Sequence, residues 1–251
     1  MSVQNPHDRF FRQSFGRPDI ARNFLEEYLP PDLQQALDLN TLVLQDGSFV
    51  DEEMQTHHTD LVYQVGLTHN SHAYLYFLFE HKSYPDPWVA FQLLRYMTRL
   101  WERQQQDKES FAPIIPLVIY HGEKRWQVAT DFLAVIDAPP ELTPYLPNFR
   151  YLLNDFSHLS NETIRGEIWL RVSLAIMRAI FDPALQSNLS ELISLVLELR
   201  DKSKGIEYIY TILYYLSDAT DRLSRDELQV VLTRHSEQGD RLMTTIAQEF
   251  R

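Results

Sequence analysis

The run from Tyr74 to Ser83, YLYFLFEHKS, constrains the fold more than any other stretch of the chain. It is rich in aromatic and aliphatic β-formers, which predicts a buried strand, and it ends in Glu80-His81-Lys82. Because successive side chains of a strand point to opposite faces, Glu80 and Lys82 lie on the same face. A carboxylate and an ammonium at the end of a buried strand are costly to desolvate, which indicates a functional role.

A second strand-like run, Asp60–Leu67 (DLVYQVGL), is separated from the next by the polar turn residues 68–71. The short connection predicts an antiparallel hairpin, in which the start of the first strand lies near the end of the second. We therefore expect Asp60 close to Glu80 and Lys82. Two carboxylates and an amine at one point suit a divalent cation and phosphodiester hydrolysis. The alternative is a surface hairpin end with an incidental Glu–Lys pair, because a lone Glu-x-Lys pattern is common.

Magnesium is the cation that this set of oxygen ligands would favour, with Mn²⁺ as an expected substitute. The expected ligands are the carboxylates of Asp60 and Glu80 and the backbone carbonyl of His81. Lys82 would orient a water molecule or help to deprotonate it, and would stabilise charge on the phosphorus. The neighbouring pair at residues 57–58, two histidines, is a poor metal site because adjacent side chains of a strand point apart.

The clearest helix is Trp88–Gln106, which follows a turn at residues 85–87 (PDP). Its apolar residues recur at spacings of three and four, and a polar stripe occupies the other side. Gln92 lies on the helix directly after the Glu-x-Lys strand, where it could hydrogen-bond the site or a backbone phosphate. The rest of the stripe is expected to contact DNA: Arg95, Tyr96, Arg99 and Arg103. The alternative is an ordinary solvated helix face.

A near-continuous apolar run, Ala112–Tyr120, predicts a strand that is buried on both faces. A helix between two strands is a crossover unit, so this strand is expected to pair in parallel with its neighbour. It is followed by His121-Gly122, for which we expect a tight turn with the glycine in an unusual backbone conformation. The alternative is that His121 is itself a residue of the candidate active site.

The chain is expected to divide into a core of residues 1–150 and a helical C-terminal region, residues 151–251. A helix over His7–Tyr28 is interrupted near Pro18, and a proline-rich connection covers residues 137–147. Further helices are predicted at residues 164–181, 190–200, 205–217 and 226–235. The aromatic run at residues 208–215 indicates either core packing or a protein interface, so the C-terminal region is expected to serve dimerisation or regulation.

The composition limits the cellular compartment and the kinds of binding site that we expect for this chain. It contains no cysteine, which excludes a disulfide framework and a cysteine-based zinc site and fits the cytoplasm. We expect no secretory signal and no membrane span, because no apolar run is long enough. The formal net charge of −12 argues mildly against nucleic-acid binding. A metal-dependent nuclease nevertheless needs carboxylates, so local basic clusters matter more than the total.

Several separated motifs together resemble the bacterial recombination-promoting nuclease family, also described as transposase-like or YhgA-like, of the PD-(D/E)XK nuclease superfamily. They are PHDRFFRQSF, the segment LQDGSFVDEEMQTHHTDLVYQV, the phrase FLFEHKSYPDPWVAFQLLRYM and PIIPLVIYHGEKRW. The resemblance covers roughly residues 5–155. Residue 59 is threonine where the superfamily motif has proline, which matters little because only the carboxylate of Asp60 would bind metal.

The resemblance implies a restriction-endonuclease-like α/β fold, in which helices flank a mixed β-sheet and a helical C-terminal region follows. It also implies Mg²⁺-dependent DNA endonuclease activity that promotes recombination and leaves a 5′-phosphate and a 3′-hydroxyl. The catalytic set it implies is Asp60, Glu80 and Lys82, with Gln92 as an auxiliary.

A second hypothesis is a non-catalytic interaction or regulatory protein on a nuclease-like fold. It would act through its helical C-terminal region, which is also where we expect homo-oligomer contacts. The acidity of the chain and its aromatic C-terminal helices favour this reading. The presence of every expected catalytic side chain argues against it.

Overall fold

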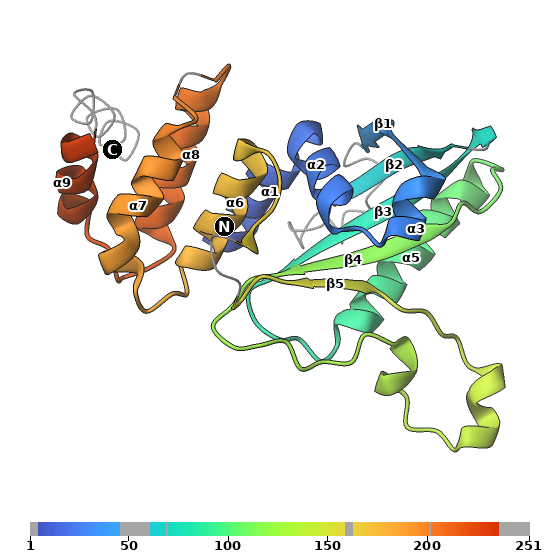
Figure 1. Ribbon diagram of the computed structural model, residues 1–251. Helices are drawn as coiled ribbons and strands as arrows, with labels where there is room; N and C mark the ends of the chain where they lie inside the picture. The colour runs from blue at the N-terminus through green and yellow to red at the C-terminus, as the bar shows by residue number, and fades with distance from the viewer. Residues whose placement is uncertain (1–4, 46–60, 69, 159–162, 201, 236–251) are drawn as a thin grey trace. The chain divides into compact units, whose positions relative to one another are not determined.

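The structure, a computed structural model, describes residues 5–45, 61–68, 70–158, 163–200 and 202–235. The chain forms two compact units (Figure 1). One runs from Phe15 to His158, and the other combines the residues before Phe15 with those after His158. This division differs from the predicted boundary at residue 150, because the first helix belongs with the C-terminal helices and not with the sheet.

The unit from Phe15 to His158 is built on a five-stranded sheet in the order β1-β2-β3-β4-β5. Strands β1, β2 and β3 are antiparallel neighbours, whereas β3, β4 and β5 run parallel. The predicted hairpin and the predicted parallel pairing are thereby confirmed, and the unit is mixed α/β. The strand bounds are β1 Leu37–Leu44, β2 Leu61–Leu67, β3 Asn70–Lys82, β4 Ile114–Tyr120 and β5 Leu152–Asp155.

Helices cover both faces of this sheet (Figure 1). Helix α5, Val89–Gln106, packs one face against a core that includes Val118 and Tyr120 of β4. On the other face, Phe24 of helix α2, Pro18–Tyr28, contacts Phe79 of β3 with ring centroids 6.0 Å apart. Alternation along each strand thus divides the buried side chains between two apolar layers.

Proline sets the starts of two short segments in this unit. Pro18 begins α2 and Pro31 begins helix α3, Pro31–Ala36, where the fixed φ of proline suits the first helical position. The long connection between β4 and β5 contains two 3₁₀ helices, η2 (Phe132–Val135) and η3 (Pro140–Tyr145). The predicted proline-rich connection therefore lies inside the sheet unit.

The helical unit consists of α1 (Pro6–Phe15, up to Ser14) and four C-terminal helices. These are α6 Ile168–Ala179, α7 Leu185–Leu197, α8 Gly205–Asp218 and α9 Arg225–His235. The predicted helices are confirmed, with bounds shifted by a few residues. Among the described residues no helix is both long and apolar enough to cross a membrane.

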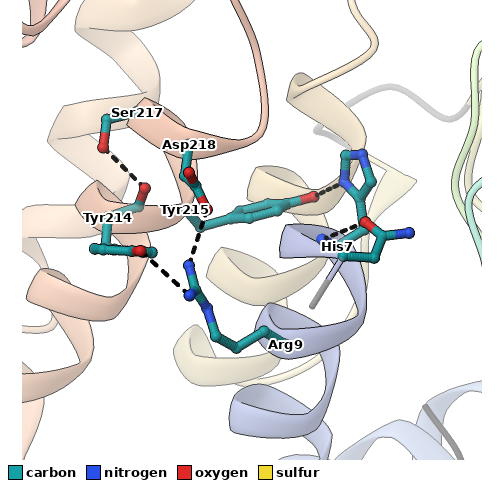
Figure 2. A network of polar contacts seen from close by, with 7 residues as sticks. His7, Arg9, Tyr214, Tyr215, Ser217 and Asp218 are labelled. Atoms are coloured by element: carbon teal, nitrogen blue, oxygen red, sulfur yellow. Dashed lines mark hydrogen bonds and ion pairs between the residues drawn. The ribbon is translucent and has the colours of Figure 1, made fainter. Parts of the chain in front are cut away.

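Contacts between α1 and α8 explain why the N-terminal helix belongs to this unit. The Phe10 ring stacks on Tyr215, with centroids 4.3 Å apart. Figure 2 shows the polar contacts beside this stack: His7 Nδ1 lies 2.7 Å from the Tyr215 hydroxyl, and Arg9 bonds Asp218 at 3.0 Å. The Arg9 guanidinium also lies over the Tyr214 ring, 4.0 Å from its centroid. The aromatic run of α8 therefore serves core packing, which was the first of its two predicted roles.

Candidate active site

Glu80 and Lys82 lie among the last residues of β3, on the face that α5 covers. Tyr76, an even-numbered neighbour on the same strand, belongs to the apolar core under α5, so alternation directs Glu80 and Lys82 to that side. In the parallel register Glu80 pairs with Val118 and Lys82 with Tyr120. The end of this buried strand thus carries two charged groups, as its sequence predicts.

The Glu80 side chain is fully buried, with 0% exposure. Its Oε1 atom lies 2.9 Å from Lys82 Nζ and accepts a hydrogen bond of 3.0 Å from Gln92 Nε2. Its Oε2 atom is buried and has no hydrogen-bond partner among the residues that the structure describes. A buried carboxylate oxygen left unsatisfied costs free energy, which a cation at that atom would offset.

Lys82 has three acceptors around its ammonium group, one for each N–H. They are Glu80 Oε1 at 2.9 Å, Gln92 Oε1 at 2.8 Å and Asp86 Oδ2 at 3.2 Å. Burial by itself would lower the pKa of Lys82, but the charges and hydrogen bonds of Glu80 and Asp86 outweigh it and raise the pKa above its usual value. Lys82 is therefore a fixed positive charge at neutral pH.

Gln92, in the first turn of α5, connects these charges. Its amide nitrogen donates to Glu80 Oε1 and to the Tyr96 hydroxyl, and its amide oxygen accepts from Lys82. The structure thus brings together three of the four predicted catalytic side chains. They come from two elements that the crossover connection places side by side.

Tyr96 does not lie on the exposed stripe where the sequence placed it. Its side chain is 3% exposed, it is part of the core under α5, and its hydroxyl accepts from Gln92. The stripe prediction failed here because Tyr96 borders the apolar face of the helix, so that its ring is buried while its hydroxyl meets the site. Its assignment as a DNA contact is not compatible with this burial.

The three arginines of the stripe are exposed, as expected for the outer face of α5. Arg99 pairs with Glu102 at 3.7 Å, and Arg103 pairs with Asp107 at 2.8 Å. Arg95 lies one turn beyond Gln92 on the same helix. Their predicted contacts with DNA stay predictions.

Asp86 is the residue of this site that sequence reasoning missed. It lies in the predicted turn before α5, where its Oδ1 atom accepts a hydrogen bond of 2.9 Å from the Trp88 backbone N–H. Its Oδ2 atom bonds Lys82. An aspartate just before a helix is a common turn and cap residue, and that signal was visible in the sequence. The contact with Lys82 depends on how the chain turns after β3.

Asp60 and the histidine pair at 57–58 lie outside the described residues. The next residue, Leu61, begins β2 and has Phe79 as its Cα partner, directly beside Glu80. The pairing of β2 with β3 is therefore the antiparallel hairpin on which the expectation for Asp60 was based. No group of three metal-ligating side chains occurs among the described residues.

Two buried histidines lie next to the site. His81 and His121 are 2% and 0% exposed, and His81 Nε2 is 2.9 Å from His121 Nδ1. By alternation the His81 side chain lies on the face opposite Glu80. The pair joins the ends of β3 and β4, which gives His121 a packing role. The predicted metal contact of the His81 carbonyl stays a prediction.

Gly122 is required for a reason other than the one predicted. Its φ is not positive, and the single glycine with positive φ in the described chain is Gly166. A Cβ atom at residue 122 would lie 2.6 Å from the backbone oxygen of Ser83. The glycine therefore permits close approach of the loops that follow β3 and β4.

Comparisons with known proteins give this arrangement a family. Residues 5–207 match the family model described as "Putative transposase, YhgA-like". The chain belongs to this family. The match extends beyond the region on which the resemblance rested and includes α6 and α7.

Three similar relatives come from Escherichia coli. RpnC of strain K12, named a recombination-promoting nuclease, is 29% identical over 246 residues, which are 98% of this chain and 80% of RpnC. RpnD of O157:H7, with the same descriptive name, is 38% identical over 125 residues, 49% of this chain and 48% of RpnD. RpnE of K12, named an inactive recombination-promoting nuclease-like protein, is 28% identical over 252 residues, 100% of this chain and 83% of RpnE. No solved structure matches the chain.

Proposed function

We propose that the chain is a Mg²⁺-dependent DNA endonuclease whose cleavage promotes recombination. The observation that carries the proposal is the buried Glu80 carboxylate, held by Lys82 and Gln92 through one oxygen while the other has no described partner. Membership of a family with relatives named as nucleases supports the same reaction class.

The residues that would hold the ion are Glu80, Asp60 and the backbone carbonyl of His81. The orphaned Glu80 Oε2 atom fits a hard cation, because it is a buried anionic oxygen without a donor among the described residues. Asp60 directly precedes Leu61, the partner of Phe79, so an unbroken hairpin register would bring its carboxylate to Glu80. When bound, Mg²⁺ supplies Lewis-acid stabilisation of the phosphate and activation of water.

Lys82 and Gln92 would supply charge stabilisation and positioning. Lys82 would stabilise negative charge on the phosphate, with Glu80 and Asp86 holding its ammonium group in place. Gln92 holds the Glu80 and Lys82 side chains in one geometry through two hydrogen bonds of its amide, and a third bond, to the Tyr96 hydroxyl, orients the amide itself. Arg95, Arg99 and Arg103 would contact the DNA backbone along the exposed face of α5.

A non-catalytic role is the second candidate, favoured by the relative RpnE, which is named inactive and matches the whole chain. In that case the sheet unit would be a scaffold, and the helical unit would mediate interactions or self-association. The intact hydrogen-bonded set of Glu80, Lys82 and Gln92 favours the catalytic reading. A chain that had lost its reaction would have no need to keep a buried charge pair that is costly to desolvate.

Cleavage of supercoiled plasmid with Mg²⁺ tests the proposal. Asp60→Asn, Glu80→Gln and Lys82→Met should each lower the rate at least about 100-fold, the usual cost of removing an electrostatic catalytic group. The matched control is Glu191→Gln, which replaces an exposed carboxylate of helix α7 and should cut at the wild-type rate. If the three site variants cut as fast as this control, the site assignment is wrong.

A further inference from the structure

Exposed aromatic side chains are concentrated beside the candidate active site. Among the described residues five phenylalanine, tyrosine or tryptophan side chains are exposed to solvent. Three of them are Tyr84, Trp88 and Phe91, which are 60%, 64% and 49% exposed. These three, here called the aromatic platform, fall within ten residues after Lys82. Of the other two, Phe111 lies in the loop before β4 and Tyr145 is the last residue of η3.

The platform is attached directly to the catalytic side chains. The Trp88 backbone N–H bonds Asp86, whose other oxygen bonds Lys82. Phe91 immediately precedes Gln92 on α5. Trp88, Phe91 and Arg95 are spaced three and four residues apart, so they share one face of the helix, and all three are exposed.

The loop after β4 contains two exposed cations. It approaches the loop after β3 so closely that a Cβ at Gly122 would meet the Ser83 oxygen, one residue before Tyr84. It then continues into Glu123, Lys124 and Arg125, all three of which are exposed. Exposed rings and exposed cations thus occur in two loops that touch at Ser83 and Gly122.

We propose that the aromatic platform stacks on unpaired DNA bases, so that the substrate is single-stranded or locally unpaired DNA. This inference rests on the proposed nuclease function and adds the class of substrate. Rings stack on any base that is not already stacked in a duplex, with cations along the backbone, which is the usual composition of single-strand sites. The net charge of −12 gives the chain little general attraction for a duplex, whereas stacking needs no net positive charge.

The test is binding without cleavage, measured on the full chain with EDTA in place of Mg²⁺. The probe is a fluorescently labelled oligothymidine, compared with a duplex of the same length. The oligothymidine should bind at least about fivefold more tightly, and Trp88→Ala and Phe91→Ala should each weaken its binding by about fivefold or more. The matched control Tyr145→Ala removes an aromatic ring that is 83% exposed elsewhere and should leave binding unchanged.

Two further measurements separate stacking from charge. Intrinsic tryptophan fluorescence should be quenched by oligothymidine in the wild type and much less in Trp88→Phe, because the ring of Trp88 is the one that meets bases. The double variant Lys124→Ala/Arg125→Ala should lower the salt dependence of binding, by about 0.7 in the log–log slope for each phosphate that is no longer neutralised. Thermal unfolding of each variant should match the wild type, since the altered side chains are exposed.

Equal affinity for duplex and oligothymidine, or wild-type affinity of both Trp88→Ala and Phe91→Ala, would overturn the inference. Its failure is distinct from failure of the proposed function. A chain that binds oligothymidine through Trp88 but does not cut after Mg²⁺ is added retains the platform and loses the nuclease proposal. A chain that cuts plasmid but binds oligothymidine equally well without the platform side chains retains the nuclease proposal and loses the inference about the substrate.

Discussion

Lys82 and Asp86 form an ion pair, 3.2 Å from Nζ to Oδ2, that joins the end of β3 to the turn before α5. The same carboxylate caps the Trp88 N–H through its other oxygen. One aspartate therefore contacts both Lys82 and the residue before the helix that carries Gln92.

Replacing this aspartate should separate its two roles. Asp86→Asn keeps an acceptor for the Trp88 N–H but removes the charge beside Lys82, whereas Asp86→Ala removes both. We expect Asp86→Ala to lower the free energy of unfolding by about 1 kcal/mol more than Asp86→Asn, the usual net value of one hydrogen bond. Both should lower plasmid cleavage. Urea unfolding and cleavage rates measure the two effects, and equal stability of the two variants would remove the capping role.

The buried pair of Glu80 and Lys82 should show strong energetic coupling. Lys82→Met leaves a buried carboxylate without its cation, which should cost roughly 3 kcal/mol or more of unfolding free energy. Adding Glu80→Gln to that variant should recover much of the loss. The exposed pair of Arg103 and Asp107, with side chains 46% and 47% exposed, gives the control, since Arg103→Met should cost less than about 1 kcal/mol. Additive effects of the two site substitutions would contradict the coupling.

Gly122→Ala should destabilise the chain even though the glycine has ordinary backbone angles. The new methyl group would press on the Ser83 carbonyl, and overpacking of this kind costs about 1–3 kcal/mol. Gly66→Ala is the comparison, because its nearest neighbour would be the Thr41 hydroxyl at 3.0 Å, a less severe approach than 2.6 Å to a backbone oxygen. Thermal unfolding should therefore show a larger fall in Tm for Gly122→Ala. A fall no larger than that of Gly66→Ala would count against the close approach.

Stability should fall at alkaline pH through buried tyrosines. Burial, followed by the nearby charge of Asp155, raises the pKa of Tyr120 to about 12. A pKa above the unfolded value contributes stability that is complete below about pH 10 and is lost as pH rises towards 12. Urea unfolding across this range should show the decline, and Tyr120→Phe should reduce it. Tyr145→Phe, at an exposed ring, serves as the control, and an equal reduction by that variant would show that burial is not the cause.

The sequence predicted the parts of the fold that depend on local patterns. Alternation around Glu80, the short turn after Leu67 and the helix after Pro87 were enough to obtain the hairpin, the parallel strand and the meeting of Glu80, Lys82 and Gln92. These inferences needed only strand period, turn length and the rule for crossover connections.

The remaining features depend on contacts between distant segments, which no local pattern encodes. The ring of Phe10 packs on Tyr215, more than 200 positions away, so α1 belongs with the C-terminal helices despite its place in the sequence. The bond between His81 and His121 and the reach of Asp86 to Lys82 likewise follow from how loops turn after β3 and β4.

Crystals of the chain soaked in Mn²⁺ would give the decisive test of the proposed metal site, because anomalous scattering locates the ion. We expect one ion bound by carboxylate oxygens of both Asp60 and Glu80, with Glu80 Oε2 among its ligands. Lys82 Nζ should stay bonded to Asp86. An Asp60 carboxylate remote from Glu80, or a Glu80 that binds no ion at saturating Mn²⁺, would contradict the proposed metal site and the reaction assigned to it.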